Sequence, residues 1–531
     1  MIRTSLTALA AIFSLGVSFA PPAVAQQEDI DQRFGAVHFA TSCNEVAQRR
    51  FDRAMRYQHS FWYQSSKEIF EDAIKADPEC AIAYWGIALS LLYNPHSPPP
   101  ASSLPAGLAA LQKGKEIGAK TERERSYVDA LSAMYVDYDK VPHRERVQAY
   151  LKKMEALAGR YTDDDEAQIL YAITLNVAAS PNDKTYANQL KGAAILEPIF
   201  KRQPRHPGVA HYLIHLYDTP ALAGKGLDAA TRYAGIAPAA PHAQHMPSHI
   251  FTRVGYWKDS IGSNIASARA AKADKDAAGQ LHAMDYMVYA YLQLGQDRNA
   301  QNVVAEMTQV PTNPDQFAYG YALAVSPARY AVERGDWKGA AELQVKPSKF
   351  AYAEAMTHFA RALGAARSGN PEAAKADIAK LAELREKLRA AKDAYWTEQV
   401  DIQWQVASAW LLYAEGKHDD ALKAMSAAAN AEDATDKHPV TPGVPTPARE
   451  LYGQMLLERG MAKEALSAFE ATLRKEPHRL GAELGAAKAA EKAGDAAKAK
   501  EHYAAAVKLA ENADPVRPEI AAARAYVAKA R

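Results

Sequence analysis

The sequence predicts an all-α protein in which antiparallel helix pairs stack side by side as a solenoid. Alanine is abundant, glycine (28) and proline (29) are modest among 531 residues, and β-branched runs are scarce. This composition favours packed helices. Glycines in segments typical of inter-helix turns recur at intervals close to the length of one helix pair. We therefore expect turns at Gly255, Gly295, Gly335, Gly369, Gly416, Gly460 and Gly494.

The C-terminal segments carry the most regular repeat. Gly460 ends a first helix, Ala465 and Phe469 pack the second, and Pro477 stops it. The next unit repeats this order with Gly494, Ala499, Tyr503, Ala506 and Pro515. The pattern resembles the tetratricopeptide (TPR) repeat, a helix–turn–helix unit of about 34 residues. The resemblance covers most of the chain and implies a right-handed helical solenoid whose concave groove binds ligands.

Short strings elsewhere resemble a bacterial family of secreted TPR proteins. They are HFATSC at 38–43, HSFWY at 59–63, DPECAIAYWG at 77–86, HPGVAHYLIH at 206–215 and HAQHMPSHIF at 242–251. That family is largely uncharacterised. The resemblance therefore implies the architecture and no catalytic residue.

The first 25 residues have the composition of a secretory signal peptide. Arg3 supplies a positive charge, an uncharged apolar stretch runs from Leu6 to Ala20, and Ala23-Val24-Ala25 is a cleavage site of small residues. The apolar stretch is short for a membrane span, and no cysteine follows the cleavage site to carry a lipid. We expect a periplasmic or secreted mature chain of about 506 residues without a membrane anchor.

Charge and length restrict the partners and the organisation. Removal of the signal segment leaves 62 basic and 62 acidic residues, a balance that favours neither nucleic acid nor an anionic membrane as partner. The mature chain is too long for one globular core. The predicted divisions are helical repeats at 26–205, His-rich repeats at 206–300, further repeats at 301–437 and a regular TPR pair at 448–531. Two proline-rich segments, 94–100 and 438–447, are expected to be surface connections.

The chain has two cysteines, Cys43 and Cys80. In an oxidising compartment a disulfide is the default expectation. Cys80 is expected at the start of one helix and Cys43 just before the equivalent helix one repeat earlier, so the two should be neighbours. A Cys₂ metal site is the weaker alternative, because no histidine has zinc-finger spacing to the pair.

Histidines recur with the repeat period in the middle of the chain. Seven of the 16 fall between His206 and His282, where an even spread would place about two. His211 and His215 precede His245 and His249 by one repeat period, and His282 follows His249 at nearly the same interval. Residues one period apart occupy equivalent places on neighbouring helices. The spacing therefore predicts that imidazoles gather on one wall of the solenoid.

This gathering predicts a metal site. Two histidines at i and i+4 share a helix face and can reach one ion. We predict a site for zinc, copper, iron or manganese formed by His211, His215, His245, His249, His282 and Asp285. Further residues expected to contact a ligand are Asp218, His242, Arg253, Tyr212 and Tyr286. An aspartate would ligate the ion, orient an imidazole or act as a base, and Arg253 would pair with an anionic group.

Local spacing places these residues more finely. Counting back from Gly255 and Gly295 assigns His249, Arg253, His282 and Asp285 to the positions that line the groove in the TPR family. Pro247 is expected in the first turn of its helix. His242 and His245 are then expected on the loop that approaches this helix.

Two other interpretations of the histidines remain open. They would form a metal-free polar pocket, or they would fill polar gaps between packed helices together with Tyr212, Tyr286 and Tyr289. The isolated histidines are expected to be structural: His38, His59, His96 and His143. A metal assay on untagged protein separates these interpretations.

The sequence contains no Gly-x-Ser-x-Gly elbow, Walker loop, dinucleotide fingerprint or His-Glu-x-x-His motif. It therefore favours a binding protein over an enzyme, with a peptide, protein or small ligand held in the concave groove beside the His/Asp cluster. Two alternatives remain. One is a metal-dependent enzyme, hydrolase-like or oxidoreductase, that uses the cluster, and the other is a plain protein–protein assembly scaffold.

Overall fold

The computed structural model describes residues 33–180, 182–311 and 317–529, which form helices joined by turns and loops without any strand. The predicted signal peptide, residues 1–25, lies outside the described residues. In chain order the helices are α2 (Glu45–His59), α3 (Tyr63–Ala76), α4 (Ala81–Ser90), α5 (Leu104–Ile117), α6 (Glu122–Ser132), α7 (His143–Arg160), α8 (Asp165–Ala178), α9 (Ala187–Arg202), α10 (Pro207–Tyr217), the 3₁₀ turn η1 (Ala223–Gly226), α11 (Leu227–Ile236), α12 (Pro241–His245), α13 (Pro247–Arg253), α14 (Trp257–Ala273), α15 (Ala277–Gln293), α16 (Asp297–Met307), α17 (Phe317–Val332), α18 (Trp337–Ala341), α19 (Ala351–Arg367), α20 (Pro371–Ala390), α21 (Ala394–Ala414), α22 (His418–Asp433), α23 (Ala448–Glu458), α24 (Ala462–Lys475), α25 (Leu480–Ala493), α26 (Ala496–Leu509) and α27 (Pro518–Lys529).

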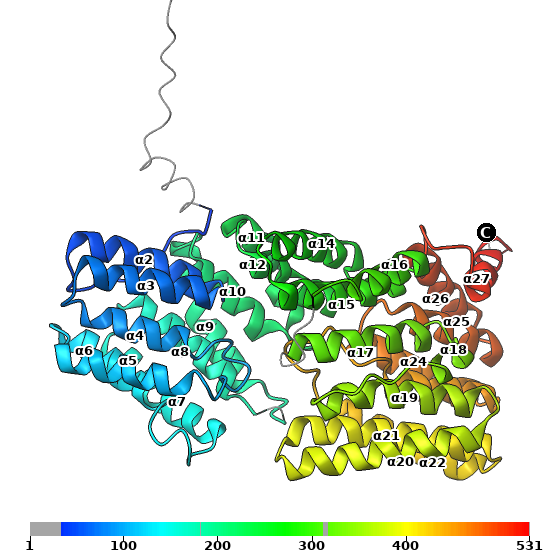
Figure 1. The fold of residues 1–531 in the computed structure, drawn as a ribbon. Helices are drawn as coiled ribbons and strands as arrows, with labels where there is room; N and C mark the ends of the chain where they lie inside the picture. The colour runs from blue at the N-terminus through cyan, green and yellow to red at the C-terminus, as the bar shows by residue number, and fades with distance from the viewer. Residues whose placement is uncertain (1–32, 181, 312–316, 530–531) are drawn as a thin grey trace, which may run out of the picture.

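The helices form a solenoid of antiparallel pairs. Successive helices pack on each other, as α2 does on α3, α14 on α15 and α25 on α26. Helices two apart also touch, including α15 with α17, α17 with α19 and α19 with α21. Figure 1 shows the pairs stacked from the blue N-terminal helices to the red C-terminal ones. The predicted all-α, TPR-like solenoid is confirmed.

The seven predicted turn glycines all lie between helices. Each adopts a left-handed backbone, with φ between 64° and 84°, a region that residues with a Cβ rarely occupy. Gly255 has a second constraint, because a Cβ there would lie 2.5 Å from the carbonyl oxygen of Pro477. The predicted divisions at residues 205 and 437 fall between helices, whereas residue 300 falls inside α16.

The C-terminal repeats close against the central ones. Trp257 Nε1 donates to the carbonyl of His478 at 2.7 Å, and the Asp514 amide donates to the carbonyl of Gly295 at 3.0 Å. The buried Arg517 guanidinium pairs with Asp297. The Trp257 and Arg517 contacts join positions 221 and 220 residues apart in sequence. The superhelix therefore brings α25–α27 back beside α14–α16 (Figure 1).

The predicted disulfide is confirmed. Cys43 and Cys80 are bonded, with their Cα atoms 4.9 Å apart. Cys80 immediately precedes α4, and Cys43 lies just before Asn44, the residue that caps α2. The bond ties the first helix pair to the second, because α2 and α4 occupy equivalent places in successive pairs.

Removal of this bond is expected to destabilise the N-terminal repeats. The bond closes a loop with a sequence separation of 37 residues, and the double change Cys43→Ala, Cys80→Ala should lower their unfolding free energy by about 2–4 kcal/mol. Urea unfolding followed by circular dichroism measures the change. Reduction of the unaltered protein should produce the same shift, and an unchanged midpoint in both samples would contradict the expectation.

The two proline-rich connections are less exposed than the prediction of surface connections implies. The first, 94–100, is half-buried, and the ring of His96 packs on that of His215 with centroids 4.3 Å apart. The second, 438–447, is mostly buried, and Arg329 Nη2 donates to the carbonyl of Gly443 at 2.9 Å. Such partners satisfy loop backbone that would otherwise require water. Both connections contribute to the lining of one cavity, the first through Pro95 and His96 and the second through Pro439.

One carboxyl group links α22 to the start of α23, directly after the second connection. Glu432 accepts a hydrogen bond from the Ala448 amide, at the start of α23, at 2.7 Å. Burial raises the pKa of Glu432 to about 7. The folded protein therefore holds this proton more tightly than the unfolded chain does. The stabilisation that comes from this bound proton is complete below pH 4.5 and is lost as the pH rises through 7.

Glu432→Gln is expected to reduce the loss of stability between pH 5 and pH 8. Glutamine keeps the acceptor for Ala448 but carries no charge, so the variant should gain at most about 3 kcal/mol at pH 8 relative to pH 5. Urea midpoints at the two pH values measure this. Glu383→Gln, at an exposed position, is the control. Urea midpoints that change equally with pH in the two variants would contradict the prediction.

Candidate metal centre

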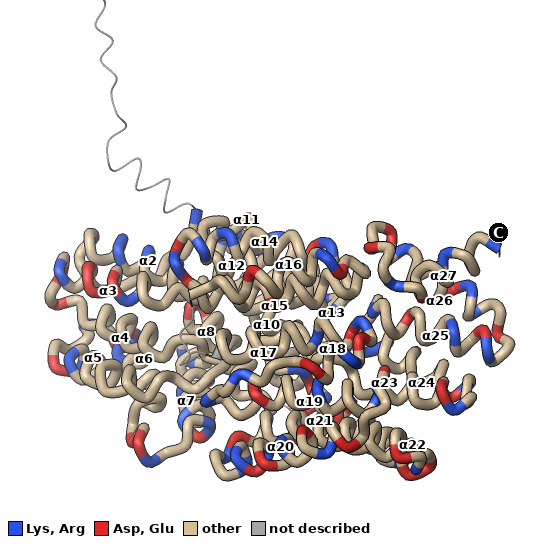
Figure 2. Tube along the Cα trace, turned by 45° about the vertical axis from the view of Figure 1, so that its right-hand side comes forward, with Lys and Arg blue, Asp and Glu red and all other residues tan. Residues whose placement is uncertain are grey.

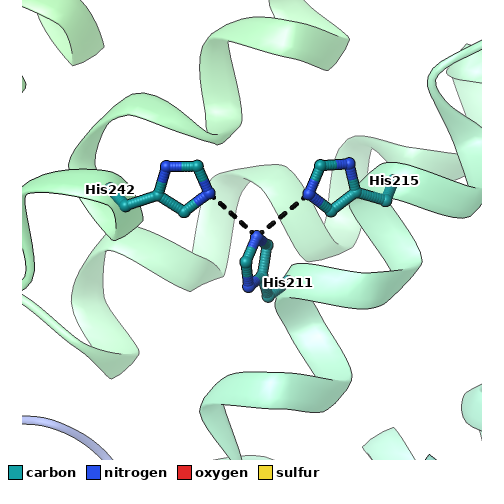
Figure 3. Close-up of side chains that lie close together, drawn as sticks. All are labelled: His211, His215 and His242. Atoms are coloured by element: carbon teal, nitrogen blue, oxygen red, sulfur yellow. Dashed lines mark hydrogen bonds between the residues drawn. The ribbon is translucent and has the colours of Figure 1, made fainter. Parts of the chain in front are cut away.

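The first group of three imidazoles, here the first triad, joins α10 to α12. His211 and His215 lie one turn apart on α10, which begins with Pro207 and is capped by the side chain of His206. The Nε2 of His211 lies 3.1 Å from the Nε2 of His215 and 3.1 Å from the Nε2 of His242 (Figure 3). The three ligand atoms lie within 4.8 Å of one another.

The second triad consists of His245 on α12, His249 on α13 and His282 on α15. The Nε2 atoms of His245 and His249 are 3.0 Å apart. The ring of His282 packs on that of His245, with centroids 4.2 Å apart. As in the first triad, the three ligand atoms lie within 4.8 Å of one another.

Two prolines shape the helices that carry the central histidines. Pro247 occupies the first turn of α13, as predicted, and Pro241 starts a separate short helix, α12. The predicted loop for His242 and His245 is therefore wrong, because α12 holds both. These two histidines contribute to different triads, so one short helix supplies both groups.

Hydrogen bonding leaves the first triad with one contact too many. His211 Nδ1 lies 2.7 Å from the carbonyl oxygen of His59, which only accepts, so Nδ1 carries the hydrogen. His211 Nε2 then has a single lone pair. That lone pair accepts one hydrogen bond, from His215 or from His242, but not both. A bound metal ion would account for both 3.1 Å contacts.

Hydrogen bonds in the second triad point to an ion more directly. The Asn264 amide nitrogen donates to the carbonyl of Ser260, which orients Asn264 Oδ1 as an acceptor for His245 Nδ1 at 2.6 Å. His249 Nδ1 donates to Asp218 Oδ2 at 2.9 Å. Both Nε2 atoms therefore present lone pairs to each other in the neutral imidazoles. Two lone pairs 3.0 Å apart repel, unless a cation lies between them.

The spacing of these nitrogens matches ligation. Two nitrogens bound at 2.0–2.1 Å to a tetrahedral ion lie about 3.3 Å apart. The contacts of 3.0–3.1 Å in the triads are within a few tenths of an ångström of that separation. Each imidazole whose Nδ1 is bonded to an oxygen is also held in the tautomer that a metal needs.

Burial keeps the imidazoles neutral. Desolvation, followed by the neighbouring imidazoles, lowers the pKa of His211 and of His282 to about 3. The pKa values of His215, His242 and His245 are lowered well below the ordinary value for the same reasons. Neutral imidazole is the form that binds a metal, so these side chains are ready as ligands at pH 7.

Asp218 supports the second triad from outside. Besides His249, its carboxylate binds Arg253 Nε at 2.8 Å and Lys437 Nζ at 2.8 Å. Burial raises the pKa of Asp218, but Lys437, Arg253 and His249 together outweigh burial and hold the pKa below its usual range. Asp218 is therefore ionised and orients His249, one of the roles expected from the sequence.

A third group resembles the triads but is satisfied by itself. Glu166 accepts from His59 Nε2 at 3.0 Å and from His206 Nε2 at 2.8 Å. The remaining ring nitrogens of these histidines contact the Tyr212 hydroxyl at 3.0 Å and the Val209 amide at 3.3 Å. Every nitrogen has a partner of the complementary kind. This buried cluster therefore needs no ion, and it packs α2 against α8 and α10.

Aromatic rings and a cavity surround the triads. Phe61 stacks on His242 and His215 and meets His211 edge-on, and Tyr286 packs against His245 and His249. A cavity of about 300 Å³ opens beside the first triad. His96, His215, Asp218, Arg253 and Lys437 contribute to its lining.

Asp285, predicted as a metal ligand, and Tyr212, predicted to contact a ligand, have polar groups that bind other partners than the triads. Asp285 is buried against Arg329, whose Nη1 donates to its Oδ1 at 2.5 Å, and it also accepts from Ser326 at 3.1 Å. Its carboxylate is thus outside both triads, because Arg329 on α17 supplies a cation for it. The Tyr212 hydroxyl contacts His59 in the third group. Arg253 binds Asp218 as well as lining the cavity.

Sequence reasoning missed several residues of this region. Phe61, Asn264 and Lys437 have no recognisable spacing to the histidines, and His96 and His59 are isolated in the sequence. One signal was available. Each triad reads as His-x-x-x-His followed by a further histidine, His242 in the first and His282 in the second. Read as a duplication, this pattern separates six histidines into two groups of three.

Comparisons with known proteins assign no family. No family model matches the chain, and no curated protein matches its sequence. Among solved structures, the human IFIT1 dimer with m7Gppp-AAAA is 13% identical at a TM-score of 0.38, covering 81% of this chain and 90% of that chain. A monomeric IFIT1 mutant with Gppp-AAAA is 14% identical at 0.37, covering 91% and 100%. Naa15/Naa10 bound to HypK-THB is 12% identical at 0.24, covering 91% and 79%. At these values no ligand is transferred.

Proposed function

We propose that this chain is an exported TPR-like protein that binds transition-metal ions through two three-histidine sites. One observation carries the proposal. His245 and His249 direct Nε2 lone pairs at each other across 3.0 Å, while Asn264 and Asp218 hold the Nδ1 hydrogens. Packing alone does not favour that arrangement, whereas an ion between the nitrogens does.

The proposed sites have room for a further ligand. Three protein nitrogens leave a coordination position open, as in catalytic rather than structural metal sites. The cavity beside His215 provides space for a small molecule or for a side chain of a bound peptide. We propose a binding protein whose groove holds such a ligand next to a metal ion.

A metal-dependent enzyme is the second candidate. The same open position would let an ion polarise a carbonyl or lower the pKa of a bound water. The buried Lys437, whose pKa is lowered to about 8 chiefly by burial, lines the adjacent cavity and would be available for proton transfer.

Metal content tests the proposal. Untagged mature protein is stripped with a chelator, loaded with Zn²⁺ or Cu²⁺, passed through gel filtration and measured by elemental analysis. We expect stoichiometric metal, and its loss in the double variant His211→Ala, His249→Ala. Folded protein that retains no metal after loading would refute the proposal and leave the histidines as packing groups.

A further inference from the structure

We propose that the two triads form a single two-copper centre whose ions share a small anionic ligand. The inference rests on the metal-binding function proposed above and goes beyond it in ion number, ion identity and coupling. Its basis is the interlocking of the triads, the charge around them and the chemistry of their donors.

The two triads share helix α12 and lie next to each other. His242 of the first and His245 of the second lie on the same short helix, α12, and their ring centroids are 6.1 Å apart. His215 of the first and His249 of the second are likewise adjacent, with centroids 6.0 Å apart. Two ions, one in each triad, would therefore be close neighbours. A ligand of one to three atoms is the size that bridges such a pair.

A residue that orients a ligand links the triads as well. α10 supplies His211 and His215 to the first triad, and Asp218, the residue directly after α10, accepts the Nδ1 hydrogen of His249 in the second. α12 supplies one ligand to each. Neither site can be assembled without helices that also build the other. The fold therefore couples the two sites mechanically.

Charge argues for ions that add little positive charge, or for an added anion. Among the described residues, Asp218 is the carboxylate that hydrogen-bonds a triad imidazole, and it already faces two cations, Lys437 and Arg253. Asp218, Lys437 and Arg253 together thus carry one net positive charge beside the second triad before any ion binds. Buried charge without compensation is costly. Monovalent copper adds the least charge, and a divalent pair requires an exogenous anion between the ions.

The donor set argues for copper. All six triad ligands are imidazoles, while the carboxylate predicted from the sequence, Asp285, is paired with Arg329. Manganese and iron sites draw on carboxylate oxygens, whereas imidazole nitrogens suit copper, which also has the highest affinity among the divalent first-row ions. Zinc, with the same preference for imidazole, is the alternative that the test must separate.

Electron paramagnetic resonance (EPR) tests the coupling directly. Chelator-stripped mature protein is loaded with Cu²⁺ in the presence of sodium azide, a small anion that bridges paired copper ions. We expect two copper ions per chain by elemental analysis and loss of most of the Cu²⁺ EPR signal, because bridged spins pair. Azide should also produce a charge-transfer absorption band.

Single-triad variants separate the outcomes. His242→Ala and, as a second choice less dependent on core packing, His282→Ala should each bind one copper ion and regain the full EPR signal of one isolated ion. Two ions with two full, uncoupled signals in the unaltered protein would overturn the inference but leave the metal-binding function standing. Copper in one triad only, or zinc in both triads with copper in neither, would also overturn the inference and leave the metal-binding function standing. Absence of any bound metal would overturn both.

Discussion

Replacement of Arg479 by methionine is expected to lower the unfolding free energy of the C-terminal half by about 3–5 kcal/mol. Arg479 is completely buried just before α25. Its guanidinium binds Glu333 Oε1 at 2.6 Å, Glu450 Oε2 at 2.9 Å and the Tyr289 hydroxyl at 2.7 Å. Methionine fills a similar volume but leaves two carboxylates in the interior without a cation. Urea unfolding measures the loss.

Two variants show whether charge is the cause. Arg389→Met removes an arginine whose pair with Glu386 is exposed, and it should change stability by less than about 1 kcal/mol. Burial raises the pKa of Glu450 to about 7, so adding Glu450→Gln to Arg479→Met should restore part of the lost stability. An equal loss in the Arg389 and Arg479 variants would contradict the assigned role.

Replacement of His211 by alanine is expected to weaken metal binding at the first triad by more than about 100-fold, because loss even of a group that only orients a ligand costs about 10–100-fold. His211 Nε2 stands between the other two nitrogens, so both contacts disappear together. Isothermal titration with Cu²⁺ or Zn²⁺ measures the change. The second triad should keep its affinity within about tenfold, since its three ligands remain.

Matched histidine controls make this result specific. His206→Gln removes a buried imidazole that donates to Glu166, and glutamine can still donate there. It should change stability but not metal stoichiometry. His38→Ala, at an exposed position, should change neither. Equal weakening of metal binding in the His206 and His211 variants would show that the first triad is not a distinct site.

Charged side chains lie mainly on the outer helices and are scarce around the triads. Figure 2 shows Lys and Arg interspersed with Asp and Glu over the outer helices, while α10, α15 and α17 in the middle are mostly tan. α10 contains no Asp, Glu, Lys or Arg. The polar groups of the centre are therefore mainly imidazoles, together with a few paired ions such as Asp218 with Arg253 and Asp285 with Arg329.

Local chemistry in the chain was enough to predict the repeats. Glycines such as Gly295 and Gly460 end helices because only a residue without a Cβ readily takes the left-handed turn. Pro247 starts a helix because its missing N–H has no partner there in any case. The repeat period likewise predicted that His211, His215, His245 and His249 lie in one region, because equivalent positions in a solenoid are neighbours.

Contacts between distant segments were not predictable in this way. Whether Asp285 faces an ion or Arg329, and whether Lys437 reaches Asp218 across 219 residues, depends on how strongly the superhelix curves. That curvature accumulates from small rotations at every helix pair and leaves no periodic pattern in the sequence. The chain by itself thus determined the all-α repeats, the disulfide and the gathering of imidazoles. Only the tertiary structure showed which ring nitrogens face each other and brought Lys437 to Asp218, because closure between remote helices decides which polar groups meet.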